Sequence, residues 1–150
     1  MSDSEGVLQT DRQSISDVFA DFYSHLYACR DGREGSERVS HEVFEKVPAV
    51  TAEELWTILK TMSNRKSPDA SGVVAELLKQ ASCNLLQVVA DMFNDILAPE
   101  AQVPAYWKRN LFKVLFKKGD TTSVDNYRPI AILPILYKLF SKTICARVIF

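Results

Sequence analysis

The sequence predicts a mixed α+β fold that is mostly helical and carries one antiparallel β-hairpin near residues 111–132. Several stretches place apolar residues three and four positions apart, which is the spacing of an amphipathic helix. From Leu111 to Phe116 the period changes to two, with Phe112, Val114 and Phe116 on one face, and this alternation is typical of a half-buried strand. The 150 residues suffice for one ordinary domain or for part of a larger one.

The first helix is expected over residues 10–29, because apolar residues recur there at helical steps opposite acids and serines. The apolar stripe consists of Ile15, Val18, Phe19, Phe22, Leu26 and Tyr27. Residues 31–40 are rich in glycine and charge and have no period, so we expect a flexible connector, followed by extended chain at 47–50. The chain thus divides into residues 1–50, a helix with an acidic linker, and residues 51–150.

A second helix is predicted to begin after Thr51. Thr51 and Glu54 form a capping-box pattern, in which Thr51 accepts from the N–H of Glu54 and the Glu54 carboxylate reaches back. The buried edge of this helix consists of Leu55, Ile58, Leu59 and Met62. The helix is expected to end near Ser63 and Asn64.

Two further helices are predicted at residues 74–81 and about 84–97, and the second buries one side. That side is lined by Leu85, Val89, Met92, Phe93 and Ile96. Pro99 ends the helix, and the Val103–Pro104 step imposes an extended turn. We interpret Met92, Phe93 and Trp107 as core residues and not as a platform on which bases stack.

The last helix is predicted to carry Pro134 in its first turn. Its apolar residues are Ile135, Leu136, Leu139, Phe140, Ile144 and Val148, and its polar side carries Lys138, Lys142 and Arg147. The sequence stops at apolar residues with neither glycine nor a polar cap, which is the pattern of an interrupted helix.

Composition excludes several classes of protein. Cys29, Cys83 and Cys145 are odd in number, far apart and supported only by His25 and His41, so a structural zinc site or a disulfide framework is not expected. We expect the three cysteines to be small buried residues and the histidines to be ordinary surface or helix residues. No apolar run approaches the ~18 residues of a membrane span, and the N-terminus lacks a secretory signal, so an intracellular protein is expected, nuclear or cytoplasmic.

The net charge of −1 conceals a split along the chain. Residues 1–50 hold five Lys or Arg against ten Asp or Glu, whereas residues 107–150 hold nine against two. A basic C-terminal third is what contact with nucleic acid or nucleotides would need, although a surface that faces another domain would show the same excess.

The hairpin region combines turn-forming residues at 119–126 with cations at the turn and on the return strand. Lys113 and Lys117 lie on the strand face opposite Phe112, so the lysines are expected to project outward. Lys is a point charge with rotatable donors and Arg is a planar fork that grips phosphate with two hydrogen bonds. Lys117 or Lys118 with Arg128 would therefore suit a triphosphate, although a basic hairpin is also typical of a plain solvated surface.

The motifs along this region strongly resemble, in order and spacing, the fingers region of reverse transcriptases from non-LTR retrotransposons. They are Phe93-Asn94, Pro104, Trp107-Lys108, Leu115-Phe116-Lys117-Lys118-Gly119-Asp120, Asn126-Tyr127-Arg128-Pro129-Ile130, Tyr137-Lys138-Leu139-Phe140 and Arg147. The resemblance is weak from about Ile15 and strong from about Met92 to Arg147. It implies an incomplete fingers subdomain of a right-hand RNA-directed DNA polymerase, a nucleotidyltransferase of a transposable element, whose partners are an RNA template, a DNA primer and deoxynucleoside triphosphates.

The resemblance also implies roles for individual residues. Lys117 or Lys118 would contact the β/γ-phosphates of the incoming nucleotide, and Arg128 its triphosphate. The loop that contains Arg65 and Lys66 would lie near the template, where the family carries Pro-Gly and Asp-Gly. Here Asp69 stands in place of the glycine and Ser71 in place of the aspartate, so a simple helix-linking loop is the alternative.

Polymerases join nucleotides through two metal ions held by clustered carboxylates. The family supplies these from a palm with an Asp after an apolar strand and a Tyr-x-Asp-Asp hairpin, and neither motif occurs in this sequence. Mg²⁺ is therefore implied for the complete enzyme only, and this chain is expected to be inactive by itself. The alternatives are a non-enzymatic nucleic-acid-binding remnant and an inert decayed reading frame; the sequence does not determine an oligomeric state.

Overall fold

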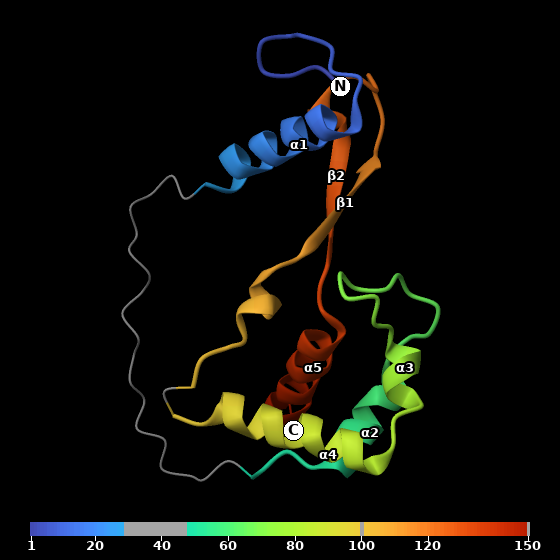
Figure 1. Cartoon of the computed structure of the whole chain (residues 1–150), viewed down its shortest axis with the longest axis vertical. Coiled ribbons are helices and arrows are strands. Elements are labelled where there is room, and N and C mark those ends of the chain that lie inside the picture. The colour runs from blue at the N-terminus through green and yellow to red at the C-terminus, as the bar shows by residue number, and fades with distance from the viewer. Residues whose placement is uncertain (29–47, 100, 150) are drawn as a thin grey trace. The chain divides into compact units, whose positions relative to one another are not determined.

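Five α-helices and one two-stranded antiparallel sheet occur in the computed structural model, which describes residues 1–28, 48–99 and 101–149 (Figure 1). This confirms the expected α+β class with a single hairpin among those residues. In chain order the elements are α1 (Arg12–Tyr27), α2 (Ala52–Thr61), α3 (Ala75–Lys79), α4 (Cys83–Leu97), the 3₁₀ turn η1 (Ala105–Lys108), β1 (Leu111–Phe116), the 3₁₀ turn η2 (Val124–Asn126), β2 (Tyr127–Ile132) and α5 (Ile135–Ile149).

The chain divides into two compact units. The described residues of the first are 1–28 and 114–130, which contain α1 and most of the hairpin; we call it the hairpin unit. The second contains residues 48–99, 101–113 and 131–149 and includes α2 to α5; we call it the helical unit. The expected connector at residues 31–40 lies outside the described residues.

In the hairpin unit, α1 packs on the return strand through few side chains. Asp11 caps the helix by accepting from the N–H of Ser14 over 2.9 Å, so α1 begins at Arg12. Phe19 meets the ring of Tyr127 edge-on at 5.1 Å and is the one residue of α1 that is buried. The prediction of a buried stripe along the whole helix is wrong, because Leu26 and Tyr27 are 50% and 67% exposed. The predicted end at Cys29 lies outside the described part of the chain.

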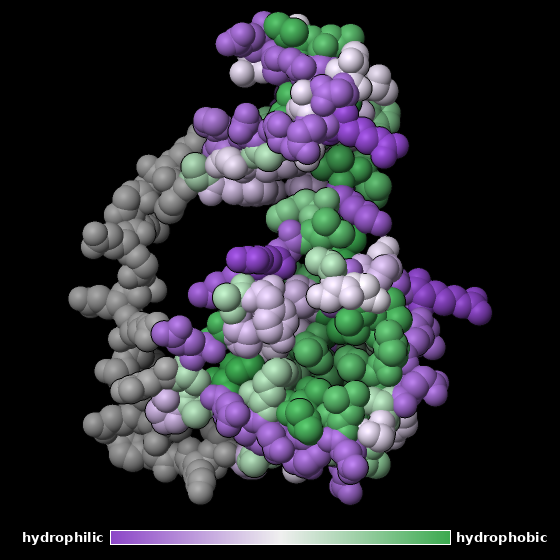
Figure 2. Space-filling view, in the orientation of Figure 1, coloured by the Kyte–Doolittle hydropathy of each residue, from purple (hydrophilic) through white to green (hydrophobic). Residues whose placement is uncertain are grey.

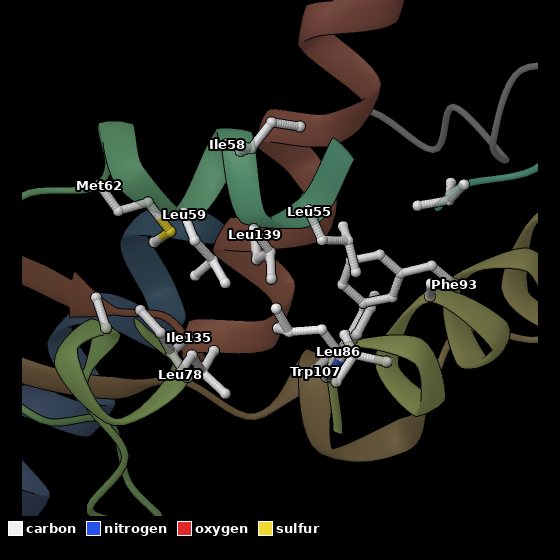
Figure 3. Packing of buried hydrophobic residues seen from close by; sticks show 14 residues of the cluster. Leu55, Ile58, Leu59, Met62, Leu78, Leu86, Phe93, Trp107, Ile135 and Leu139 are labelled. Carbon is white, nitrogen blue, oxygen red and sulfur yellow. The ribbon is translucent and has the colours of Figure 1, made fainter. Parts of the chain in front are cut away.

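The helical unit has a single apolar core between α2, α4 and α5 (Figure 3). The predicted edge of α2 is confirmed, since Leu55, Ile58, Leu59 and Met62 are all buried members of this core. On α4 the buried residues are Leu86, Val89, Ala90 and Phe93. Leu85 was expected in this face but is 47% exposed, because the buried stripe of α4 runs through Leu86, Val89, Ala90 and Phe93 and Leu85 lies beside it.

Aromatic rings fill the middle of this core. Phe93 has no exposed surface and meets Trp107 and Phe140 edge-on at centroid distances of 6.1 and 5.1 Å. Trp107 is 3% exposed and also contacts the ring of Tyr137 at 5.6 Å. The interpretation of Phe93 and Trp107 as core residues is therefore confirmed. Buried rings in edge-to-face contact contribute about 0.5–1.5 kcal/mol per pair beyond the area they bury.

Arg147 joins the last turn of α5 to the start of α2. Its guanidinium donates to both carboxylate oxygens of Glu54, at 2.7 and 2.6 Å, and to the carbonyls of Pro48 and Ala49. The first half of the capping box at Thr51 is confirmed, because Thr51 Oγ1 accepts from the N–H of Glu54 over 3.2 Å. The second half is wrong, since the Glu54 carboxylate binds Arg147.

The cysteines and histidines of the described residues lie at the surface. Cys83 and Cys145 are exposed, so the prediction that they are buried is wrong; Cys29 lies outside the described residues. Cys83 opens α4 at the surface, where the helix needs no apolar contact. His25 is an exposed helix residue, as expected, and His41 falls outside the described chain. Among the helices described, none has the length and apolar character that crossing a bilayer requires.

Candidate nucleotide-binding hairpin and nucleic-acid-binding loop

The pairing of the two strands places Lys117 and Arg128 on one face of the hairpin. The N–H of Lys117 donates to the carbonyl of Asn126 over 2.8 Å, which sets these two residues opposite each other in an antiparallel pair. Two steps along, Arg128 lies opposite Leu115, so Lys117 is its diagonal neighbour on the same face. Diagonal neighbours have Cα atoms about 7–8 Å apart, within the joint reach of two long side chains.

Two other observations agree with this register. Phe116 and Tyr127 fall opposite each other on the other face, and their ring centroids are 5.4 Å apart. Pro129 falls at a position whose N–H would not pair with β1, so its missing donor costs the ladder nothing. Lys118 is one residue beyond Lys117, already in the turn, and does not share the strand alternation with Arg128.

The three cations predicted to bind a nucleotide are free to meet one. Lys117, Lys118 and Arg128 are all exposed. Within residues 1–28, 48–99 and 101–149 the one ion pair is that of Arg147 with Glu54, so no described carboxylate neutralises the hairpin cations. An incoming anion would therefore not have to displace an existing partner.

The turn beneath these cations is held by its own hydrogen bonds. Gly119 adopts φ +94°, and a Cβ there would approach the Asn126 amide nitrogen to 2.8 Å, so glycine is needed on both counts. Asn126 Nδ2 donates to the carbonyl of Asp120 over 2.9 Å, and the Tyr127 hydroxyl donates to the carbonyl of Thr121 over 2.9 Å. Such a turn fixes where the strands end and so where the cations stand.

Asp120 is the acid nearest to the turn lysines in sequence, and its carboxylate is occupied. Its Oδ1 accepts from both the N–H and the hydroxyl of Thr122, each over 2.8 Å. These hydrogen bonds, chiefly the one from the N–H of Thr122, hold the pKa of Asp120 below its ordinary value. Asp120 therefore remains ionised at neutral pH while directed at Thr122 and not at the lysines.

A cavity of about 670 Å³ opens between α1, the N-terminal residues and the turn, but its charge is wrong for a nucleotide. It is lined by Asp3, Asp21, Asp120 and Asp125 with His25, and no Lys or Arg contributes to it. Like charges would repel a triphosphate from this space. The exposed face that carries Arg128, and not the cavity, is thus the anion-binding candidate.

The expected half-burial of the first strand is wrong. Phe112 and Phe116 on one face are 57% and 47% exposed, and Leu115 on the other is 54% exposed. Figure 2 shows hydrophobic residues at the surface of the hairpin. A two-stranded sheet has too little partner surface to cover both of its faces, and α1 reaches it mainly through Phe19 and Tyr23.

Arg65 and Lys66 lie in the helical unit, in the loop between α2 and α3, and both are exposed. Arg65 has φ +57°, a left-handed conformation for a residue with a side chain, and its N–H donates to a carboxylate oxygen of Glu76. Lys79 Nζ donates to the carbonyl of Met62 over 2.6 Å at the end of α2. The loop is thus tied to α3 at its start, with both cationic side chains outward.

Asp69 organises the second half of the same loop, a role that sequence reasoning missed. Its Oδ1 accepts from the N–H groups of Ser71 and Val73, and its Oδ2 accepts from the N–H of Ile135 at the start of α5 over 3.0 Å. The sequence contained one local signal, because Asp followed two residues later by Ser is a common turn pattern. The bond to Ile135 joins residues far apart in the chain and leaves no sequence signal.

No three or more His, Cys, Asp or Glu side chains gather closely enough to hold a metal ion in the described parts of the chain.

Three curated proteins of transposable elements are similar to this chain. The Transposon TX1 uncharacterized 149 kDa protein of Xenopus laevis is 26% identical over 156 residues, which cover 95% of this chain and 12% of that protein. The RNA-directed DNA polymerase from mobile element jockey of Drosophila melanogaster is 30% identical over 102 residues, covering 67% of this chain and 11% of that protein. The chain belongs to the reverse transcriptases of non-LTR retrotransposons.

A third relative gives the same result. The probable RNA-directed DNA polymerase from transposon BS of Drosophila melanogaster is 28% identical over 102 residues, or 67% of this chain and 11% of that protein. The chain thus spans only 11–12% of the length of the curated relatives it matches. No family model matches the sequence.

Proposed function

We propose that this chain forms the fingers part of an RNA-directed DNA polymerase and holds the triphosphate of the incoming deoxynucleotide on the hairpin. The observation that supports this is the shared hairpin face of Lys117 and Arg128, both exposed and without a carboxylate partner in the described residues. Arg65 and Lys66 would contact the template strand from the loop between α2 and α3.

Each cation has a distinct part in this proposal. The Arg128 guanidinium would grip two phosphate oxygens in a bidentate manner, and the Lys117 ammonium would add a mobile point charge. During nucleotide transfer negative charge builds on the departing pyrophosphate, where fixed cations stabilise the transition state. Lys118 would contribute charge from the turn without sharing the strand face.

The chemical step would depend on carboxylates that this chain does not carry. Two Mg²⁺ ions bound by a palm would activate the primer hydroxyl and steady the leaving phosphates. Asp120 accepts from Thr122 and Asp69 accepts from backbone N–H groups, so both carboxylates hold local chain segments in this arrangement. The chain alone would bind nucleotides without extending a primer.

A binding titration of the 150-residue chain with a fluorescent deoxynucleoside triphosphate tests the nucleotide site. Arg128→Ala should weaken binding about tenfold or more, because a hydrogen bond to a charged group contributes about 1.5–3 kcal/mol. Arg12→Ala is the matched control, since it removes the same charge from an exposed position of the same unit and should leave affinity within about twofold. Equal effects of the two changes, or no binding by the unmodified chain, would contradict the proposal.

A second comparison separates the adjacent lysines. Lys117→Ala should reduce nucleotide affinity more than Lys118→Ala, because only Lys117 shares the strand face with Arg128. A larger loss of affinity in Lys118→Ala than in Lys117→Ala would mean that the nucleotide approaches the turn and not the strand face.

A further inference from the structure

A small pocket in the helical unit gathers lysines from two segments that are far apart in the sequence. Lys66 comes from the loop after α2, and Lys138 and Lys142 come from successive turns of α5. The other lining residues are Met62, Ser63, Ser67, Val74, Ala75 and Ile135. The floor is therefore largely apolar, and the charged groups are all positive.

The charges in this pocket are uncompensated. Lys138 and Lys142 are four residues apart on one helix face, where like charges repel and destabilise the helix by a few tenths of a kcal/mol. No carboxylate forms an ion pair with any of the three lysines in the described residues. A bound anion would remove this repulsion, whereas water only screens it.

Two carboxylates near this pocket, those of Asp69 and Glu76, already accept hydrogen bonds from backbone N–H groups. Asp69 accepts from three backbone N–H groups, including that of Ile135 in the pocket lining, and Glu76 accepts from the N–H of Arg65. Lys79, bonded to the carbonyl of Met62, adds a further positive charge next to the lining. The local balance is therefore positive.

The pocket's size limits what the anion can be. Its volume is about 200 Å³, below the roughly 300–1,000 Å³ of sites that enclose whole small molecules. A nucleoside triphosphate would not fit inside it, whereas one phosphate of a chain that continues past the opening would. Lys66 and Lys142 are exposed and Lys138 is partly buried, so the ammonium groups can meet a phosphate at the mouth while the Lys138 stem lies on the apolar floor.

We propose that Lys66, Lys138 and Lys142 bind a backbone phosphate of a single nucleic-acid strand. This rests on the proposed template-side role of Lys66 and adds two residues of α5 to it. Contacts to phosphate position a strand without reading its sequence, so this pocket would fix the path of the strand over α5.

The test is fluorescence anisotropy of the 150-residue chain with short unstructured RNA and DNA oligonucleotides of the same base, over a series of salt concentrations. Lys138→Gln with Lys142→Gln removes both charges and keeps helix-forming side chains of similar length. Affinity should fall about tenfold, and the slope of log affinity against log salt should shrink by roughly 0.7, the value for one phosphate of a single strand.

The matched control is Lys60→Gln with Lys108→Gln, two exposed lysines of the same unit outside the pocket lining. The control should change affinity about twofold or less, and Lys138→Arg with Lys142→Arg should retain wild-type binding. Equal loss with RNA and DNA would assign the pocket to the phosphate alone, and greater loss with RNA would assign it to the RNA strand.

The proposal is overturned if the glutamine pair binds both oligonucleotides with the wild-type affinity and salt slope, or if the control pair loses as much. A measurement of nucleotide affinity distinguishes failure of this proposal from failure of the nucleotide site proposed on the hairpin. The glutamine pair should keep wild-type affinity for the fluorescent triphosphate while Arg128→Ala loses it, so failure at either site leaves the other measurable. Loss of triphosphate binding in the glutamine pair would also overturn the assignment to a strand phosphate.

Discussion

Arg147→Met is expected to lower the free energy of unfolding of the helical unit by about 2–3 kcal/mol near pH 7. The change removes two hydrogen bonds to Glu54 and two to the carbonyls of Pro48 and Ala49 but keeps a long apolar side chain. The side chains of Arg147 and Glu54 are 20% and 26% exposed. Exposed pairs contribute about 0–1 kcal/mol and loss of one partner from a buried pair costs about 3–5, so this partly buried pair falls between them.

The same pair predicts a pH dependence. The hydrogen bonds from Arg147 are the main reason that the pKa of Glu54 lies below its ordinary value in the folded chain. A lowered carboxyl pKa stabilises the fold above the unfolded pKa, which is about 4.3 for Glu, and that contribution is lost as the pH falls through the folded pKa. The difference in unfolding free energy between wild type and Arg147→Met should therefore narrow in acid.

Urea unfolding followed by tryptophan fluorescence measures both effects, because Trp107 is buried in the core of this unit. Arg109→Met is the matched control; Arg109 is exposed, and its replacement should change stability by about 0.5 kcal/mol or less. The role assigned to the Arg147–Glu54 pair is refuted if Arg147→Met changes the unfolding free energy near pH 7 by no more than this control. It is also refuted if the loss of stability is equal at acid and neutral pH.

Two further changes probe the loops. Asp69→Ala should destabilise the helical unit by about 2–3 kcal/mol, because three backbone N–H groups lose their acceptor; urea unfolding of Asp95→Ala, at an exposed helix position, is the control. Gly119→Ala should destabilise the hairpin by about 1–3 kcal/mol through its positive φ and the clash with Asn126. Chemical shifts of the turn residues that match wild type in the Gly119→Ala chain would contradict that reason.

Local patterns predicted most of the helical unit. The Thr51 cap and the buried edge from Leu55 to Met62 follow from spacing within one helix, and the structure bears both out. Trp107 was predicted to be a core residue and not a base-stacking platform, and it is buried. These features need no knowledge of what lies across the core.

Several of the missed features depend on residues distant in sequence. Glu54 binds Arg147 instead of completing its own capping box, and Asp69 reaches the start of α5. Lys138 and Lys142 were visible as a polar helix face, but their meeting with Lys66 depends on how α5 packs. Leu85 and Leu86 are adjacent apolar residues, and which of them faces the core depends on how α4 packs.

For the candidate site on the hairpin, the sequence predicted the charged residues but not how they are arranged. The motif around Arg128 named the cations, whereas the strand pairing that sets Arg128 diagonal to Lys117 emerged only with the register. The expected burial of one strand face failed because alternation predicts which side chains share a face, not whether anything covers it.

The exposed ribbon has a practical consequence for handling the purified chain. Phe112, Leu115 and Ile130 lie open on a two-stranded sheet, and the outer edge of each strand pairs with nothing else in the described residues. Unpaired strand edges beside apolar side chains are templates on which other molecules can add as extra strands. Concentrated stocks would thus thicken or cloud with time, so ligand titrations are best begun from dilute, freshly clarified samples.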